Sequence, residues 1–259
     1  MSEPPLPWVP VLLYHRVVER MPEQDPAGNC VTARTFETHL RWLARRGYRS
    51  MTVSELVRSA LNDRGQSGLR VAITFDDGYE DNLIHALPLL ERFGFTATVF
   101  VITDVIGSHN HFDSHLGGEP VRMLSAGQVR SLADAGLEVG SHTCTHPHSL
   151  PLLVDSALDD QLRRSRSVLE GILGRRVRSF SYPHSRVDSR VERAVAEAGY
   201  DAACAGTGTR FTPFHLSRVA PPPAPGPALE LNMGWRWLKH SVARRRSAAS
   251  RARDRVLSD

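Results

Sequence analysis

Residues 71–78 have the sequence Val-Ala-Ile-Thr-Phe-Asp-Asp-Gly, in which an apolar run ends in two adjacent acids and a glycine. The run has the length and composition of a buried strand. Adjacent side chains on a strand point to opposite faces, but Gly78 lets the backbone turn, so Asp76 and Asp77 can face one pocket. The simpler interpretation is a turn that closes a strand, because Asp and Gly are common in turns.

A second polar cluster follows another short strand, at residues 137–140. His142 and His146 are four residues apart, which would place both rings on one face of a helical turn, and Pro147 favours a tight turn over a long helix. With Asp77 they would supply two imidazoles and a carboxylate, and three protein ligands leave one position open for water, as in a catalytic zinc site. Asp76 could then accept a proton from that water, which indicates hydrolysis. A surface turn is the alternative interpretation of the histidine pair.

The order of these motifs resembles that of the polysaccharide deacetylases, carbohydrate esterase family four. The matching segments are residues 74–78 (Thr-Phe-Asp-Asp-Gly), 142–146 (His-Thr-Cys-Thr-His) and 180–184 (Phe-Ser-Tyr-Pro-His). Residues 9–17, with their Leu-Tyr-His segment, are similar to the opening strand of one branch of the family. The resemblance spans about residues 9–220. It implies a single (β/α) barrel, distorted or incomplete and seven-stranded, and a metal-dependent hydrolase that removes an N-acetyl group from an acetamido sugar.

The resemblance also implies roles for single residues. Asp76 corresponds to the catalytic base, and one divalent metal, zinc first with cobalt, nickel or iron as alternatives, would be held by Asp77, His142 and His146. The residue after the proline of the third motif, here His184, would help to hold the oxyanion through its backbone N–H, which any side chain permits. Ser185 replaces the usual glycine, and the arginine that many members have just upstream is absent. The sequence therefore does not predict the shape of this side of the site.

The general acid is the largest departure from the family pattern, because no convincing late Leu-x-His motif follows residue 200. His240 has the right spacing but lies in an arginine-rich tail. His15 ends the first expected strand and should open on the same face as Asp76, so we expect His15 to be the acid. The alternative for His15 is a polar residue satisfied at a strand end. Arg218, in the last expected strand, is a candidate neighbour of the base.

Strand and helix patterns alternate along the chain. After the first strand, apolar residues recur at helical spacing over 36–43, before a stop at Gly47. The further expected strand and helix pairs are 71–75 with 81–93, 96–102 with 125–135, 138–141 with 152–173, and 177–182 with 188–198, followed by strands near 202–205 and 216–220. Repeated units of this kind predict a parallel sheet covered by helices, closed or nearly closed as a barrel, with its site at the C-terminal strand ends.

Residues 103–122 are too polar for a core and predict a loop over the mouth of the site. Phe112 in this loop would either contact a sugar ring or anchor the loop. The histidines of the loop could suggest a second metal site, but a surface loop is the favoured interpretation. The three cysteines, Cys30, Cys144 and Cys204, have no paired spacing, which argues against a disulfide framework and suits a reducing compartment. We expect Cys144 to be a buried filler between the two histidines rather than a ligand.

Composition predicts one barrel domain over residues 1–220, because 259 residues with 41% hydrophobic composition suit a single core. A proline-rich linker and basic tail would occupy 221–259. Residues 236–259 contain eight Lys or Arg against two Asp, although the whole chain has a net charge of +4. This tail would either contact an anionic membrane surface or pack its aromatic residues on the barrel, whereas nucleic acid is disfavoured. Residues 1–10 lack a signal-peptide pattern, which predicts a cytoplasmic protein or one at the inner membrane surface.

Two other functions stay open. A barrel with impaired catalysis could act as a carbohydrate-binding partner, as the altered third motif and the missing late histidine would suggest. A deacylase acting on a non-sugar amide or ester would use the same residues. The intact set of acids and histidines favours the sugar N-deacetylase.

Overall fold

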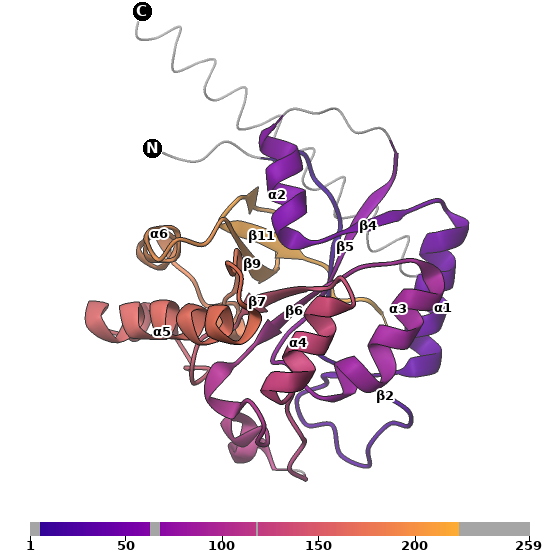
Figure 1. Ribbon diagram of the computed structural model, residues 1–259, viewed down its shortest axis with the longest axis horizontal. Coiled ribbons are helices and arrows are strands. Elements are labelled where there is room, and N and C mark those ends of the chain that lie inside the picture. Colours follow the sequence, from indigo (N-terminus) through magenta and orange to yellow (C-terminus); the bar gives the residue numbers. More distant parts are fainter. Residues whose placement is uncertain (1–5, 63–67, 118, 223–259) are drawn as a thin grey trace, which may run out of the picture.

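The computed structural model describes residues 6–62, 68–117 and 119–222, and within them a main sheet of nine strands is surrounded by helices (Figure 1). The strands of this sheet are β1 (Val11–Tyr14), β4 (Arg49–Met51), β5 (Arg70–Phe75), β6 (Thr98–Val101), β7 (Glu138–Ser141), β8 (Ser179–Ser181), β9 (Ala202–Thr207), β10 (Phe211–Thr212) and β11 (His215–Arg218). The α-helices are α1 (Ala33–Arg45), α2 (Val53–Leu61), α3 (Leu87–Phe93), α4 (Ala126–Asp134), α5 (Asp155–Leu173) and α6 (Ser189–Glu197).

The main sheet curls into a distorted barrel, as expected. Its parallel strands follow the order β1, β5, β6, β7, β8, β9 and β11. The two ends meet at a short seam, where Leu12 bridges Val219 and the Leu13 N–H donates to the Val219 carbonyl over 2.9 Å. Strands β4 and β10 lie outside this ring, paired with β5 and β11.

The alternation of side chains along β5 explains the two faces of the sheet. Val71, Ile73 and Phe75 belong to the large apolar core that the sheet forms with the helices. Ala72 belongs instead to a second cluster, whose members come from opposite sides of the ring and therefore fill the barrel interior. This inner cluster also contains residues of α2, so α2 caps the barrel at one end.

The β4–α2 unit at this end was not expected from the sequence. Helix α2 begins with a capping box between Thr52 and Glu55. Its first N–H groups are satisfied from inside the barrel, because the Val53 N–H donates to Oγ1 of Thr98 and the Ser54 N–H to Oε2 of Glu138. The unit was not predicted because β4 has only three residues, too few for a periodic pattern.

Other elements also differ from the expectation. The helix expected over 81–93 begins as a π-helix, η1 (Asn82–Ala86), and continues as α3. Strands β2 (Arg16–Val18) and β3 (Cys30–Thr32) form a separate small sheet, and the loop 103–122 contains two 3₁₀ turns, η2 (Thr103–Val105) and η3 (His111–Leu116). These segments are too short for a periodic pattern to reveal them.

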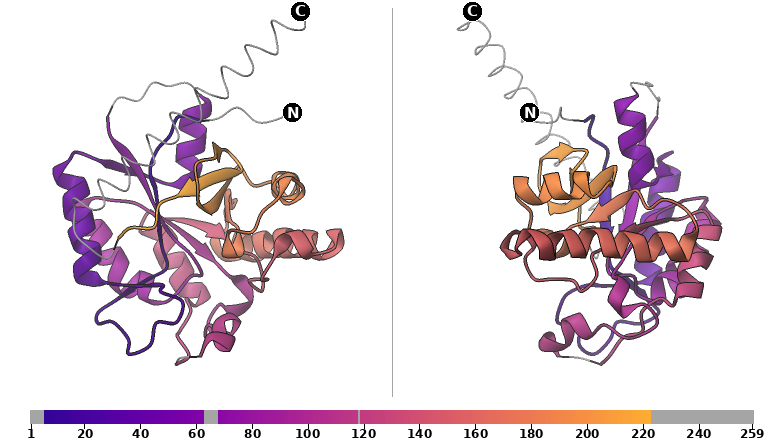
Figure 2. Two further views of the ribbon diagram at one scale, coloured as in Figure 1. Left: turned by 180° about the vertical axis from the view of Figure 1, so that it is seen from behind. Right: turned by 60° about the vertical axis from the view of Figure 1, so that its left-hand side comes forward.

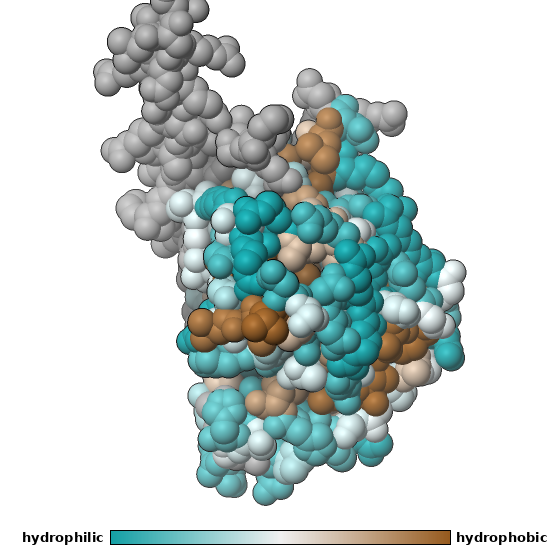
Figure 3. Space-filling view, turned by 90° about the vertical axis from the view of Figure 1, so that its left-hand side faces the viewer, coloured by the Kyte–Doolittle hydropathy of each residue, from teal (hydrophilic) through white to brown (hydrophobic). Residues whose placement is uncertain are grey.

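The outer helices leave a largely hydrophilic surface. Figure 2 shows the long α5 running across the molecule with α6 beside it, and Figure 3 shows a mainly polar face with limited apolar patches. No described helix has both the length and the apolar character needed to cross a bilayer. The expected basic tail, most of its linker and His240 lie outside the described residues.

Candidate metal and catalytic site

The residues singled out in the sequence gather at one end of the barrel. Each follows or ends a parallel strand, and the C-terminal ends of parallel strands open on the same face. Strand β1 leads to His15, β5 to the acid pair, β7 to His142 and His146, and β8 to the turn with His184, while Arg218 is the last residue of β11.

Three side chains face a common point at this end. Ligand atoms of Asp77, His142 and His146 all lie within 4.8 Å of one another. Oδ1 of Asp77 is 3.3 Å from Nε2 of His142 and 3.6 Å from Nε2 of His146. The same Oδ1 atom is buried without a hydrogen-bond partner, which is costly unless a cation is bound there. One carboxylate and two imidazoles suit zinc or a similar divalent ion, so the residues fit the expected metal.

The two histidines are prepared for this role. Nδ1 of His142 donates to the carbonyl oxygen of Ser181 over 2.8 Å, which leaves Nε2 with its lone pair directed at Asp77. Burial lowers the pKa of His146 to about 3, against the weaker opposing effect of Asp77. His146 is thus neutral, the form that binds a metal, whereas in the metal-free protein Asp76 and Asp77 outweigh burial and raise the pKa of His142.

The backbone at the site is unusual. Among the described residues, five that are not glycine have positive φ, and each lies in one of the three motifs or directly after it: Asp77, Thr143, His146, His184 and Ser185. His142 and His146 therefore do not share a helical turn, as the spacing suggested, but lie in an irregular loop in which Thr143 has φ 69° and His146 has φ 56°. Such conformations cost on the order of 1 kcal/mol each and typically cluster at functional sites.

The second acid has a different partner. Asp76 forms a bidentate ion pair with Arg218, whose Nη1 and Nη2 each lie 2.7 Å from a carboxylate oxygen. The Arg218 side chain is 1% exposed and donates further to the Ala205 carbonyl and to the hydroxyls of Thr74 and Ser181. These bonds use all five guanidinium N–H groups. Arg218 therefore neighbours the expected base, as the sequence suggested.

The two acids are kept ionised by different neighbours. Burial alone would raise the pKa of the Asp76 carboxyl, but the Arg218 guanidinium and the His142 imidazole hold it well below its usual range. Burial likewise raises the pKa of the Asp77 carboxyl, but in the metal-free protein its interaction with His142, whose own pKa is raised, outweighs burial and lowers the Asp77 pKa. Both acids are therefore ionised, one against an arginine and the other against the histidines.

His15 lies between β1 and β2, within electrostatic reach of both acids. Its carbonyl accepts a hydrogen bond from Nδ2 of Asn82 over 2.8 Å. Asn82 opens the π-helix η1, and π-helical turns often mark functional positions. Asp81, which directly precedes η1, pairs with Arg16 over 2.8 Å, so His15 and Arg16 are both held by residues at the start of η1.

The third motif forms an exposed wall. Residues 183–185 make a short turn in which the N–H groups of Ser185 and Arg186 donate to the carbonyls of Tyr182 and Pro183, so these bonds do not use the N–H of His184. The ring of His184 lies 4.6 Å from that of His146, centroid to centroid. Ser185, where the family has glycine, keeps the left-handed conformation with φ 59° and packs against Gly206 of β9.

The loop 103–122 lies against the metal cluster. The Phe112 ring is 4.8 Å from His146 and 6.4 Å from Tyr79, and Phe112 packs on a small apolar cluster beneath the loop. The Tyr79 hydroxyl donates to Asp113 over 3.2 Å. Phe112 thus anchors the loop while covering one side of a ligand histidine. Cys144 is fully buried with its sulfur against α5 carbonyls, as a filler would be.

A comparison with known families agrees with this geometry. The family model "Polysaccharide deacetylase" matches residues 63–203, more than half of the chain. The chain belongs to the polysaccharide deacetylase family. Within this family, the chain is 29% identical over 194 residues to YxkH of Bacillus subtilis, covering 74% of this chain and 62% of that protein. It is 26% identical over 211 residues to the poly-beta-1,6-N-acetyl-D-glucosamine N-deacetylase of Staphylococcus epidermidis, covering 73% of this chain and 68% of that protein.

Solved structures share the fold of this deacetylase-family barrel. The Streptococcus pyogenes deacetylase PplD, in complex with acetate, superposes with a TM-score of 0.74 at 21% identity over 90% of this chain and 99% of that one. IcaB from Ammonifex degensii gives a TM-score of 0.70 at 23% identity over 85% of this chain and 94% of that one. At these identities the likeness concerns the fold.

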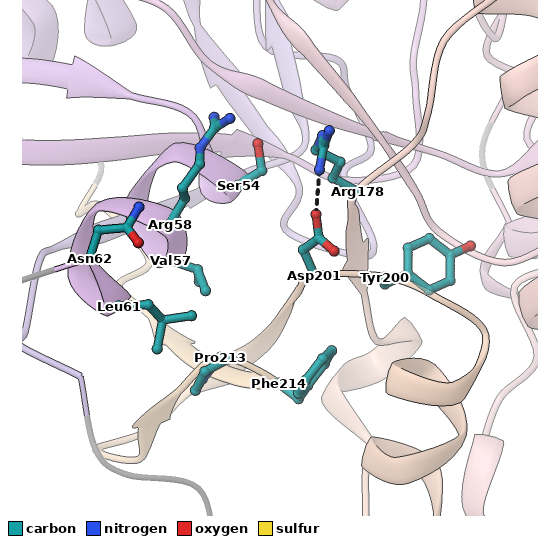
Figure 4. Close-up of a pocket in the computed structure, with 10 residues that line it drawn as sticks. All are labelled: Ser54, Val57, Arg58, Leu61, Asn62, Arg178, Tyr200, Asp201, Pro213 and Phe214. Atoms are coloured by element: carbon teal, nitrogen blue, oxygen red, sulfur yellow. Dashed lines mark hydrogen bonds and ion pairs between the residues drawn. The ribbon is translucent and has the colours of Figure 1, made fainter.

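Two hollows in this deacetylase-family barrel differ in their relation to the site. A groove of about 560 Å³ is lined among others by Arg16, Tyr79 and Asp113, which are close in sequence to site residues, but no residue of the metal cluster lines it. An apolar pocket of about 480 Å³ lies between α2 and the residues that precede β8, β9 and β11, with the Arg178–Asp201 pair on its wall (Figure 4). Because those residues precede the strands, this pocket lies at the opposite end of the barrel from the metal cluster.

Sequence reasoning missed Ser181 and Thr74. Ser181 holds His142 through its carbonyl and both Asp76 and Arg218 through its hydroxyl. Thr74 accepts from Arg218 and donates to the Leu12 carbonyl. The alternation of polar and apolar residues could have revealed both. Each is a polar residue between two apolar neighbours, so its side chain is expected to point to the opposite face, into the barrel.

Proposed function

We propose that this protein removes the N-acetyl group from an acetamido sugar in a glycan or glycan precursor. The main support is that the cluster of Asp77, His142 and His146 lies beside the separate Asp76–Arg218 pair, at the C-terminal strand ends of a deacetylase-family barrel. The N-acetylglucosamine polymer named for the Staphylococcus epidermidis relative supports this substrate class.

The cluster would hold one divalent ion, with zinc as the first candidate and cobalt, nickel or iron as alternatives. When bound, such an ion lowers the pKa of a coordinated water and polarises the amide carbonyl. Asp77 would supply negative charge to the ion through Oδ1, which is buried without a hydrogen-bond partner. The Ser181 carbonyl fixes the orientation of the His142 ring.

Proton transfer is divided between two residues. Asp76, kept ionised by Arg218, accepts a proton from the attacking water, whose oxygen bonds to the acetyl carbon. The His184 N–H donates to the developing oxyanion. When the C–N bond breaks, protonated His15 gives its proton to the leaving amine, so that acetate and a free amino sugar result.

The test is acetate release from a panel of acetamido sugars by protein loaded with one equivalent of zinc. We expect turnover in the wild type, and loss of about a hundredfold or more in Asp76→Asn with the metal retained, because proton transfer is removed and coordination is not. His146→Ala should lose the metal itself. Metal and activity vanishing together in Asp76→Asn would show that Asp76 is a ligand.

The same panel separates the other candidate functions. Sugar binding without acetate release by the metal-loaded protein would identify a barrel that only binds carbohydrate. Turnover confined to non-sugar amides or esters would identify a general deacylase. Either outcome would overturn the proposal.

A further inference from the structure

Two histidines beside the metal cluster have no part in the proposed chemistry through their side chains. The rings of His148 and His184 lie 5.0 Å apart, centroid to centroid, at an interplanar angle of 54°. The two ligand histidines, His142 and His146, are 4.9 Å apart at 52°. The outer pair therefore has nearly the same mutual geometry as the pair that we expect to share an ion.

Both outer rings are presented from constrained backbone. His148 follows Pro147 in the loop after β7, and His184 follows the buried Pro183 in the turn after β8. His184 is further fixed in the left-handed region with φ 51°. A proline with fixed φ precedes each histidine, which restricts the backbone from which the two rings are presented.

The outer pair is also accessible, and it borders the first cluster, because the His184 ring lies 4.6 Å from that of His146. His148 and His184 are both exposed, whereas the side chain of His146 is only 8% exposed and its Nε2 faces Asp77. Among the described residues, no carboxylate or third imidazole completes a three-ligand group with the outer pair. Two protein ligands leave the remaining positions to water or to substrate hydroxyls.

We propose that His148 and His184 form a second, weaker site for a divalent ion that prefers imidazole, such as zinc, nickel or copper. The occupied site would lie at the mouth, against the turn that supplies the proposed oxyanion donor, and would hinder entry of the acetamido group. Excess metal should therefore inhibit. This inhibition rests on the proposed function, whereas binding of the second ion does not.

Zinc titration by calorimetry, starting from protein that holds one equivalent, tests the binding. The wild type should take up a second equivalent more weakly than the first. His148→Gln should lose this second equivalent and keep the first, with a fall in affinity of at least about tenfold. His109→Gln is the matched control, because its exposed ring lies 6.1 Å from His111, whose Nε2 is engaged by Ser108.

The outcomes are decisive in both directions. A second equivalent that persists in His148→Gln, or that disappears equally in His109→Gln, would overturn the site. In acetate-release assays, the zinc concentration for half inhibition should rise about tenfold or more in His148→Gln. An unchanged value would overturn the inhibitory role. If no substrate is turned over at all, the proposed function fails while the calorimetry still decides whether the second ion binds.

Discussion

The contact between Asp76 and Arg218 dominates the site at the scale of single residues. Both side chains are almost fully buried, and every guanidinium N–H is satisfied. A buried ion pair adds little stability compared with apolar residues of the same size, but removal of one partner leaves an uncompensated charge. The pair is therefore better explained by its effect on Asp76, the proposed base, than by its contribution to stability.

Substitution of the arginine gives the first prediction. Arg218→Met should lower the free energy of unfolding by about 3–5 kcal/mol, because Asp76 stays buried without its counter-charge. Adding Asp76→Asn to that variant should restore a large part of the loss. Urea unfolding of the four proteins in this cycle measures the coupling. Additive losses would contradict a direct charge interaction.

Acid stability gives the second prediction. Because the pKa of Asp76 is depressed in the folded protein, the unfolded chain binds this proton at higher pH. The pair's contribution is complete well above the unfolded pKa of about 3.9 and is lost as the pH falls through the folded pKa. Between pH 5 and 3, the metal-free wild type should lose about 1 kcal/mol more than Asp76→Asn. Equal losses in urea unfolding would show that Asp76 titrates normally.

The irregular turns after β5, β7 and β8 matter most at the scale of elements. Their left-handed residues orient the proposed metal ligands, and one of these residues, Ser185, also determines how its turn packs on the sheet. A Cβ added at Gly206 of β9 would lie 2.6 Å from the Cβ of Ser185. The serine that replaces the family's glycine is thus accommodated by a glycine on the neighbouring strand.

This contact gives the third prediction. Gly206→Ala should destabilise the protein by about 1–3 kcal/mol through overpacking. The loss should largely disappear when Ser185→Gly is added, because the clashing side chain is removed. Thermal unfolding of the two single variants and the double variant measures this. If the double variant is no more stable than Gly206→Ala, the turn does not pack on β9 as the structure shows.

The elements differ in how far the sequence predicts them. The segment 71–78 and the histidine motif predict ligands and strand ends, because buried strands have strong patterns and the chemistry is local. The left-handed turns at His146 and Ser185 were not predicted, since only glycine signals such a conformation in a sequence. The β4–α2 unit was missed because its strand is short and its helix is fixed by Thr98 and Glu138, far away in the chain.

Closure of the barrel belongs to the scale of the whole molecule. The alternating units predict a barrel, but the seam between Leu12 and Val219 joins segments that no local pattern connects. The contact between Phe112 and His146 was likewise not predictable from the sequence, because it depends on how a long loop folds back. Arg218 could be proposed as a neighbour of the base only from its place in the last strand.

A truncation gives the fourth prediction. Every residue of the proposed mechanism lies within the described part of the chain, and His240 does not. A protein ending at Pro223 should therefore release acetate within about threefold of the full chain, whereas His15→Ala should lose about a hundredfold on unactivated amides. A truncated protein that folds but no longer hydrolyses amides, while His15→Ala still does, would place the acid in the tail.

The contact between Asp76 and Arg218 also has a consequence for synthesis of the chain. The two residues are 142 positions apart, and the arginine lies on the final strand of the ring. A nascent chain emerging from the ribosome presents both acids and the ligand histidines long before the guanidinium appears. Until then Asp76 has no counter-charge, and burying it is unfavourable. This end of the barrel can therefore mature only once nearly the whole domain has been translated, so an incomplete chain should not release acetate in the proposed reaction.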